Sequence, residues 1–138
     1  MSIKQISVFL ENTTGRICEV TQTLANAGIN LRAISIADTA DFGILRLIVD
    51  KNEQAINALS AAGFTTRQTD VAAVEIDDKP GSLAALMEIC QKSGINIEYL
   101  YASLEGKEGK AVVIFKLEDH ESGFSVLEKN GLKLADRF

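Results

Sequence analysis

Several residue types are scarce or absent in this chain of 138 residues, and each absence excludes a class of protein. The chain has no tryptophan, one proline, one histidine and two cysteines, and aromatic residues make up only 6%. Two cysteines cannot form the dense disulfide framework of small secreted domains. A single histidine leaves few side chains for a catalytic or metal-binding set. No apolar run approaches the roughly 18 residues of a membrane-spanning helix.

Clustered positive charge is lacking as well. Fourteen lysine and arginine residues are scattered among 19 acidic residues, which gives a formal net charge of −5. A surface for nucleic acid or for an anionic membrane would concentrate basic residues. Met1–Leu10 has neither the basic start nor the long apolar run of a signal peptide. We therefore expect a soluble, cytoplasmic protein with no nucleic-acid or membrane partner and with two reduced, buried thiols, Cys18 and Cys90.

An internal repeat is the strongest positive signal in the sequence. It becomes visible when the chain is shifted by 66 residues, the separation between Gly15 and Gly81. Three pairs of segments then match in the same order: Ile6–Ile17 with Ala72–Leu83, Gly28-Ile29-Asn30 with Gly94-Ile95-Asn96, and, past a two-residue insertion near Glu105–Gly109, Gly63 with Gly131. Because glycines and apolar positions coincide throughout, we expect two copies of one module, residues 1–68 and 69–138.

Each copy shows the same succession of strand and helix signals. Short β-rich runs predict strands, and apolar residues at helical spacing predict helices that end at glycines. The first helix carries Ile17, Val20, Leu24 and Ala27 on its apolar face. The first copy is expected to contain strands Ile6–Leu10, Asn30–Ala37, Ile44–Val49 and Phe64–Arg67, a turn at Asp38–Phe42, and helices at Gly15–Gly28 and Asn52–Ala62. The second is expected to contain strands Val71–Ile76, Ile95–Leu104, Ala111–Leu117 and Leu132–Leu134, and helices around Leu83–Cys90 and Phe124–Leu127.

The order β-α-β-β-α-β, found twice, is the ferredoxin-like arrangement, an α+β fold in which two helices cover one face of an antiparallel sheet. One such unit of about 65 residues buries only about 60% of its unfolded surface and is marginal alone. It also leaves an edge strand uncovered. The linker between Gln68 and Asp70 is very short, so we expect the copies to lie close together. Uncovered edge strands or sheet faces would also favour a homodimer.

Two loops connect a strand to a helix at corresponding positions, Asn12-Thr13-Thr14-Gly15 and Asp78-Lys79-Pro80-Gly81. Unpaired backbone N–H groups and the positive end of the helix dipole meet at such a junction, so a carboxylate fits there. Glycine lets a ligand approach those groups because it has no Cβ. Asn12 or Asp78 would then bind the ammonium group of an α-amino acid. In the alternative interpretation, Gly and Pro only shape a turn, and Asn12 and Asp78 cap the helices.

The loop of the second copy carries a resemblance to a known family. Asp77-Asp78-Lys79-Pro80-Gly81-Ser82-Leu83, followed by Ser93-Gly94-Ile95-Asn96-Ile97, resembles the signature of the ACT domain. That signature is an acidic or amide residue, Pro-Gly-x-Leu, a helix, and Gly-Ile-Asn-Ile before the second strand. The resemblance covers nearly the whole chain as two tandem domains. Thr14 replaces the usual proline in the first copy, and Asp78 and Lys79 replace the usual amide in the second.

The resemblance implies a regulatory module that binds an amino acid or a related small ligand, without a cofactor, at the interface of paired domains. Such domains often form a continuous eight-stranded sheet. The carboxylate of the ligand is expected on the N–H groups near Gly15–Ile17 or Gly81–Leu83. The implied ligand-binding residues are those of the two loops, the first two residues of the helix after each loop, and the asparagine of each Gly-Ile-Asn. They are Asn12, Thr13, Thr14, Gly15, Arg16, Ile17, Asn30, Asp78, Lys79, Pro80, Gly81, Ser82, Leu83 and Asn96.

Other candidate residues favour no other activity. His120 lies in a charged stretch, where we expect a solvated surface side chain. The acidic pairs Asp77–Asp78 and Glu118–Asp119 have no nucleophile and no dense carboxylate cluster with them, so no catalytic or metal site is expected. Tyr99 and Tyr101 are the only neighbouring aromatics that could stack on RNA bases, and little basic charge accompanies them.

We therefore expect a non-enzymatic protein that binds a free amino acid and controls a separate metabolic enzyme or pathway. The alternative from another class is a protein–protein assembly module that is built on ACT domains and binds no ligand. Retained affinity for an amino acid would favour the first interpretation. A stable complex with an enzyme, formed regardless of amino acids, would favour the second.

Overall fold

The computed structural model describes residues 3–38, 41–104 and 106–135. Within these residues the chain forms four helices and seven strands, in the succession expected from the sequence. The helices are α1 (Arg16–Asn26), α2 (Asn52–Ala61), α3 (Ser82–Lys92) and α4 (His120–Lys129). The strands are β1 (Ile3–Glu11), β2 (Leu31–Asp38), β3 (Phe42–Val49), β4 (Thr65–Asp77), β5 (Ile97–Ala102), β6 (Lys110–Leu117) and β7 (Lys133–Leu134). The turn expected at Asp38–Phe42 includes residues 39 and 40, which lie outside the described residues.

The chain divides into two compact units, which gather residues 4–69 and residues 70–135. We refer to them as the first and the second module. Among the described residues, none of the helices is both long enough and apolar enough to cross a membrane.

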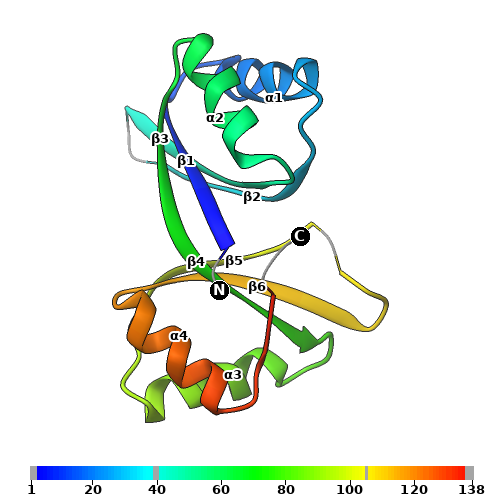
Figure 1. The fold of residues 1–138 in the computed structure, drawn as a ribbon, viewed down its shortest axis with the longest axis vertical. Coiled ribbons are helices and arrows are strands. Elements are labelled where there is room, and N and C mark those ends of the chain that lie inside the picture. The colour runs from blue at the N-terminus through cyan, green and yellow to red at the C-terminus, as the bar shows by residue number, and fades with distance from the viewer. Residues whose placement is uncertain (1–2, 39–40, 105, 136–138) are drawn as a thin grey trace. The chain divides into compact units, whose positions relative to one another are not determined.

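In the first module, β2, β3, β1 and β4 follow one another in the sheet, and α1 and α2 cover one of its faces (Figure 1). The β1–β3 pair is antiparallel, with Ile6 opposite Leu47 and Glu11 opposite Phe42. Alternate strand residues face the helices, as the period of two in a strand requires. The core includes Ile6, Val8, Leu10, Val20, Leu24, Leu45, Leu47, Ala55 and Leu59.

The second module repeats this arrangement, with β5, β6, β4 and β7 in order and α3 and α4 on one face (Figure 1). Its core contains Ala72, Val74, Leu86, Cys90, Val113, Phe115, Leu117 and Leu127. The fully buried Leu24 of α1 and Cys90 of α3 occupy corresponding positions, as the 66-residue shift requires. The α+β prediction of two ferredoxin-like modules is confirmed.

Two strands expected at the junction form a single strand, β4. The sequence suggested Phe64–Arg67 and Val71–Ile76 as separate strands, whereas β4 runs for 13 residues from Thr65 to Asp77. Neither glycine nor proline occurs between these ends, and the intervening residues include threonine and valine, which favour extended backbone. The eight expected strands are therefore present as seven within the described part of the chain.

The expectation that both thiols are buried is wrong for Cys18. Cys90 is buried in the second core, whereas Cys18 is exposed, and both are free thiols. The helical period explains the difference, because α1 turns Val20 and Leu24 toward the core and leaves Cys18 outside. Burial raises the pKa of the Cys90 thiol.

Truncation of Phe115 should show how strongly the second module depends on its core. The side chain is fully buried. We expect Phe115→Ala to lower the free energy of unfolding by about 3–5 kcal/mol, as loss of a buried phenyl ring does elsewhere. Urea denaturation followed by circular dichroism measures the change. Leu104→Ala is the control, since Leu104 is 67% exposed; equal losses for both variants would contradict the assigned core.

Candidate functional site

The two strand-to-helix loops have the same backbone conformation. Gly15 precedes α1 with φ 91° and ψ −10°, and Gly81 precedes α3 with φ 91° and ψ −13°. A positive φ of this size is costly for residues with a Cβ and readily adopted by glycine. The turn from each strand into the following helix therefore requires glycine at this point.

The backbone hydrogen bonds of the two loops also correspond. Each loop uses one bond to the neighbouring hairpin, two bonds within the loop and one into the helix. In the first module they are Asn12 N to Asp41 O, Thr13 N to Glu11 O, Arg16 N to Thr13 O, and Glu19 N to Gly15 O. In the second they are Asp78 N to Gly109 O, Lys79 N to Asp77 O, Ser82 N to Lys79 O, and Ala85 N to Gly81 O. The duplication thus extends to the geometry of the candidate site.

Glycine occupies the N-cap position of both α1 and α3. The N-cap residues are Gly15 and Gly81, and neither helix start has a side-chain capping hydrogen bond. Asn12 and Asp78 each lie three residues before the N-cap and do not occupy that position. The N–H groups of Arg16 and Ser82 donate to the loop, and the N–H groups that follow them in the first turn have no partner within the helix, so an external acceptor can bind these. A Cβ added to either glycine would meet no atom within 4 Å among the described residues, so the space beside both glycines is open.

An apolar side chain is exposed beside each glycine. Ile17 in α1 is 45% exposed and Leu83, its counterpart in α3, is 39% exposed. Ile17 was expected on the apolar face of its helix, but in both helices the residue one turn later, Val20 or Leu86, enters the core. Each loop therefore combines open backbone donors with an apolar surface, which suits an amphipathic small molecule.

The asparagines of the two Gly-Ile-Asn segments lie at the opposite ends of the helices from the loops. Each helix has 11 residues and is therefore about 16 Å long. The backbone N–H of Asn30 donates to Asp50 Oδ1 at 3.0 Å, and the carbonyl of Asn96 accepts from the backbone N–H of Glu118 at 3.0 Å. Within either module the structure does not bring these asparagines together with the glycine loop.

The side chain of Arg16 contacts Phe64 and Glu19. Its guanidinium group lies 4.9 Å from the centre of the Phe64 ring and pairs with Glu19 at 2.6 Å. The remaining predicted residues of the two loops are exposed, apart from Ser82, which is half-buried. The structure therefore brings Asn12–Gly15 together with Ile17, and Asp78–Leu83 together as one surface.

A groove of about 560 Å³ lies beside the loop of the second module. Its walls come from the end of β4, the loop, the part of α3 from Ser82 to Ile89, the start of β6, and the residues Leu132 and Lys133 at the start of β7. Lys79, Pro80, Gly81 and Ser82 line it, as do Ala85 and Leu132. This volume is within the usual range of small-molecule sites, about 300–1,000 Å³.

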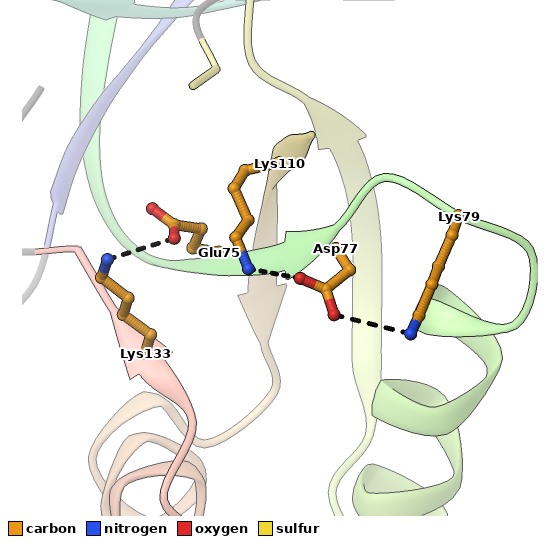
Figure 2. A network of polar contacts seen from close by, with 5 residues as sticks. All are labelled: Glu75, Asp77, Lys79, Lys110 and Lys133. Atoms are coloured by element: carbon orange, nitrogen blue, oxygen red, sulfur yellow. Dashed lines mark hydrogen bonds and ion pairs between the residues drawn. The ribbon is translucent and has the colours of Figure 1, made fainter. Parts of the chain in front are cut away.

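Five charged side chains gather at this groove (Figure 2). Lys110 pairs with Asp77, Lys79 lies 3.8 Å from the same carboxylate, and Lys133 pairs with Glu75 at 3.1 Å. Asp77 and Lys110 are directly opposite on β4 and β6, as are Glu75 and Lys133 on β4 and β7. Sequence reasoning did not single out Glu75, Lys110 or Lys133, because their meeting depends on strand register. The sequence did contain a signal for this cluster: Glu75 and Asp77 alternate along one strand, and lysines occur in the strands that pair with it.

The other candidate residues take part in packing or helix capping. His120 begins α4 and packs against Phe124, with 5.4 Å between ring centres. The Asp119 side chain accepts from the backbone N–H of Ser122 and caps that helix. Tyr101 is buried on β5. Across the described ranges, His, Cys, Asp and Glu side chains form no group of three or more that could hold a metal ion.

The Asp77–Lys110 pair predicts a pH response. The hydrogen bond and the charge of Lys110 lower the pKa of Asp77 below its ordinary 3.8, and Asp77 raises the pKa of Lys110 above 10.5. The pair should therefore stabilise the fold fully between pH 3.8 and pH 10.5, the ordinary pKa values of the two groups. Its contribution from Asp77 is lost as pH falls from 3.8 through the lowered pKa, and that from Lys110 is lost as pH rises through the raised pKa.

Lys110→Gln should raise the pKa of Asp77 toward 3.8, which a titration of the carboxyl carbon by nuclear magnetic resonance would measure. Lys79→Gln is the matched control and should raise it less, because Lys79 acts only through its charge. An unchanged pKa in Lys110→Gln would contradict the pairing.

Comparisons with known proteins agree with this architecture. A family model described as an ACT domain pair matches residues 1–137. The crystal structure of protein BT0572 from Bacteroides thetaiotaomicron is 38% identical, with a TM-score of 0.91 over 98% of this chain and 92% of that chain. No curated protein sequence matches the chain.

Two regulatory subunits of aspartate kinase share the fold at lower identity. The ligand-free form from Thermus thermophilus is 22% identical, with a TM-score of 0.69 over 94% of this chain and 93% of that chain. The subunit from Thermus flavus is 20% identical, with a TM-score of 0.61 over 94% and 92%. The ACT resemblance seen in the sequence is confirmed by the family model, and the chain belongs to the ACT domain pair family.

Proposed function

We propose that this protein is an amino-acid-binding regulator that contains no catalytic site and acts on a separate metabolic enzyme. The ligand is held at the glycine loops that precede α1 and α3. Its carboxylate accepts hydrogen bonds from the N–H groups of the first helical turn. Its ammonium group lies near the polar residues of the loop, Asn12 in the first module and Asp78 in the second.

The duplicated open junction is the observation that carries this proposal. Both junctions have glycine at the N-cap with φ 91° and the same loop hydrogen bonds. Both also have an exposed apolar residue in the first turn of the helix. A turn needed only for chain reversal would not require open donors and an uncovered apolar side chain in both copies, since burial of apolar surface is favourable.

The family and its relatives support a regulatory role. The chain is an ACT domain pair, and the fold is shared with regulatory subunits of aspartate kinase, one of which is described as ligand-free. From this similarity we infer that ligand binding to this protein changes the activity of a separate enzyme. The position of the ligand relative to the other module, and assembly into a homodimer, stay predictions from the sequence.

A thermal-shift screen against the twenty amino acids, followed by calorimetric titration, is the direct test. A ligand at 100 times its dissociation constant should add about 2.7 kcal/mol to the stability of the folded state. A selective stabilising amino acid supports the regulator. If no amino acid stabilises the protein at millimolar concentration, the proposal fails and the ligand-free assembly module takes its place.

Substitution of the loop glycines should locate the site. We expect Gly15→Leu and Gly81→Leu each to abolish binding at its own loop, because the side chain would project into the open space in front of the N–H groups. Each variant should also lose about 1–2 kcal/mol of stability from the left-handed backbone. Calorimetric stoichiometry measures the first effect and urea denaturation the second.

Gly63→Leu is the matched control for these variants. Gly63 has φ 89° and equally open surroundings, but it lies at the end of α2. Its variant should lose similar stability and keep full binding. If Gly15→Leu and Gly81→Leu fold and bind normally, the ligand is bound elsewhere. Gly15→Ala and Gly81→Ala provide smaller changes in case the leucine variants unfold.

A further inference from the structure

The two modules share one backbone at the loop but differ in the space beside it. In the first module Arg16 lies over Phe64 and pairs with Glu19, so this side of the loop is filled by a stacked, charged side chain. The corresponding residues of the second module are Ser82, Leu132 and Ala85. All three are smaller, and all three line the open groove. The duplicated chain thus keeps a groove open beside α3 at the position where Arg16 lies beside α1.

The charges around the loops differ as well. The lining of the groove includes three lysines, Lys79, Lys110 and Lys133, and two carboxylates, Glu75 and Asp77. The corresponding residues of the first module are Thr13, Phe42, Thr65, Phe9 and Glu11. The lining of the groove therefore carries one positive charge in excess, whereas the corresponding positions of the first module hold no lysine and expose two phenyl rings, Phe9 at 43% and Phe42 at 61%.

The pairing of the charges leaves positive charge for a ligand. Asp77 is shared by Lys110 and Lys79, so one carboxylate balances two ammonium groups, while Lys133 and Glu75 balance each other (Figure 2). The first residues of α3, Gly81 and Ser82, line the same groove, and the helix dipole adds partial positive charge there. A ligand that complements this set carries two anionic groups and one ammonium group. These are the charges of an amino acid with an acidic side chain.

We propose that the groove of the second module binds an acidic amino acid, with one carboxylate on the α3 N-terminus and the other on the lysines, and that the first module does not. This inference rests on the proposed function, because it names the ligand class of the second loop. The ammonium group of the ligand lies near Asp78, as in the proposed function, and beside Asp77. Lys110 and Lys133 exchange part of their pairing with Asp77 and Glu75 for the carboxylate of the side chain.

The test compares acids with their amides on the full chain by calorimetry. L-Glutamate and L-aspartate should bind at least about tenfold more tightly than L-glutamine and L-asparagine, because each amide lacks one charge-assisted hydrogen bond. The affinity for the acids should fall as salt rises from about 0.05 M to about 0.5 M, since these groups are exposed and screened. In amide N–H spectra, chemical shifts should change at Gly81 and Lys133 and not at Gly15.

Removal of single lysines provides the matched variants. Lys110→Gln and Lys133→Gln should each weaken glutamate binding about tenfold or more and change glutamine binding about twofold or less. Lys129→Gln, at the exposed last turn of α4 and outside the groove, removes the same charge and should change neither. Lys110, Lys133 and Lys129 are all exposed, so the three variants should fold.

Separate outcomes overturn this inference and the proposed function. If amides bind as tightly as acids, or if the groove lysines can be replaced without effect on glutamate, the acidic assignment fails while the amino-acid regulator stands. If glutarate, which has no ammonium group, binds as tightly as glutamate, the groove is a dicarboxylate site and the amino-acid class fails. If glutamate binding shifts Gly15 and spares Gly81, the assignment to the second module fails.

Discussion

The turn from strand to helix within four residues is the constraint on which each module depends. The first helix must pack on the sheet that contains the strand before it, and the chain reverses at a glycine with φ 91°. This requirement leaves the helix without a side-chain cap and its first N–H groups without a partner within the helix. The same backbone geometry that allows α1 and α3 to cover their sheets therefore creates the proposed binding surface.

The comparison of the two copies separates what the backbone determines from what the side chains determine. Loop hydrogen bonds and glycine conformations are common to both modules. The side chains that surround them are not: Arg16 occupies the space beside α1, whereas Ser82 leaves it open beside α3. A fold duplicated in this way can keep one architecture while its two sites diverge in charge and size.

Much of the fold could be predicted from local patterns. The spacing of Val20 and Leu24 predicts the buried face of α1, and the recurrence of Gly15 at Gly81 predicts the duplicated loop. The expected burial of Cys18 followed the general tendency of free cysteine and was wrong, because the period that buries Val20 and Leu24 leaves Cys18 exposed. The meeting of Glu75 with Lys133 was also beyond local reasoning. It depends on which residues of β4 and β7 face each other, and register is a property of the folded sheet.

The continuous strand β4 affects how this chain can change. The boundary between the two compact units falls between Thr69 and Asp70. Both residues lie within the single strand β4. Proteases cut exposed, irregular loops readily and strands poorly, so digestion between the modules should be slow. An insertion there would interrupt strand pairing, whereas the turns of each hairpin tolerate added residues. During evolution, length variation should therefore collect in the turns, as the two-residue difference between the copies near residues 105–109 illustrates.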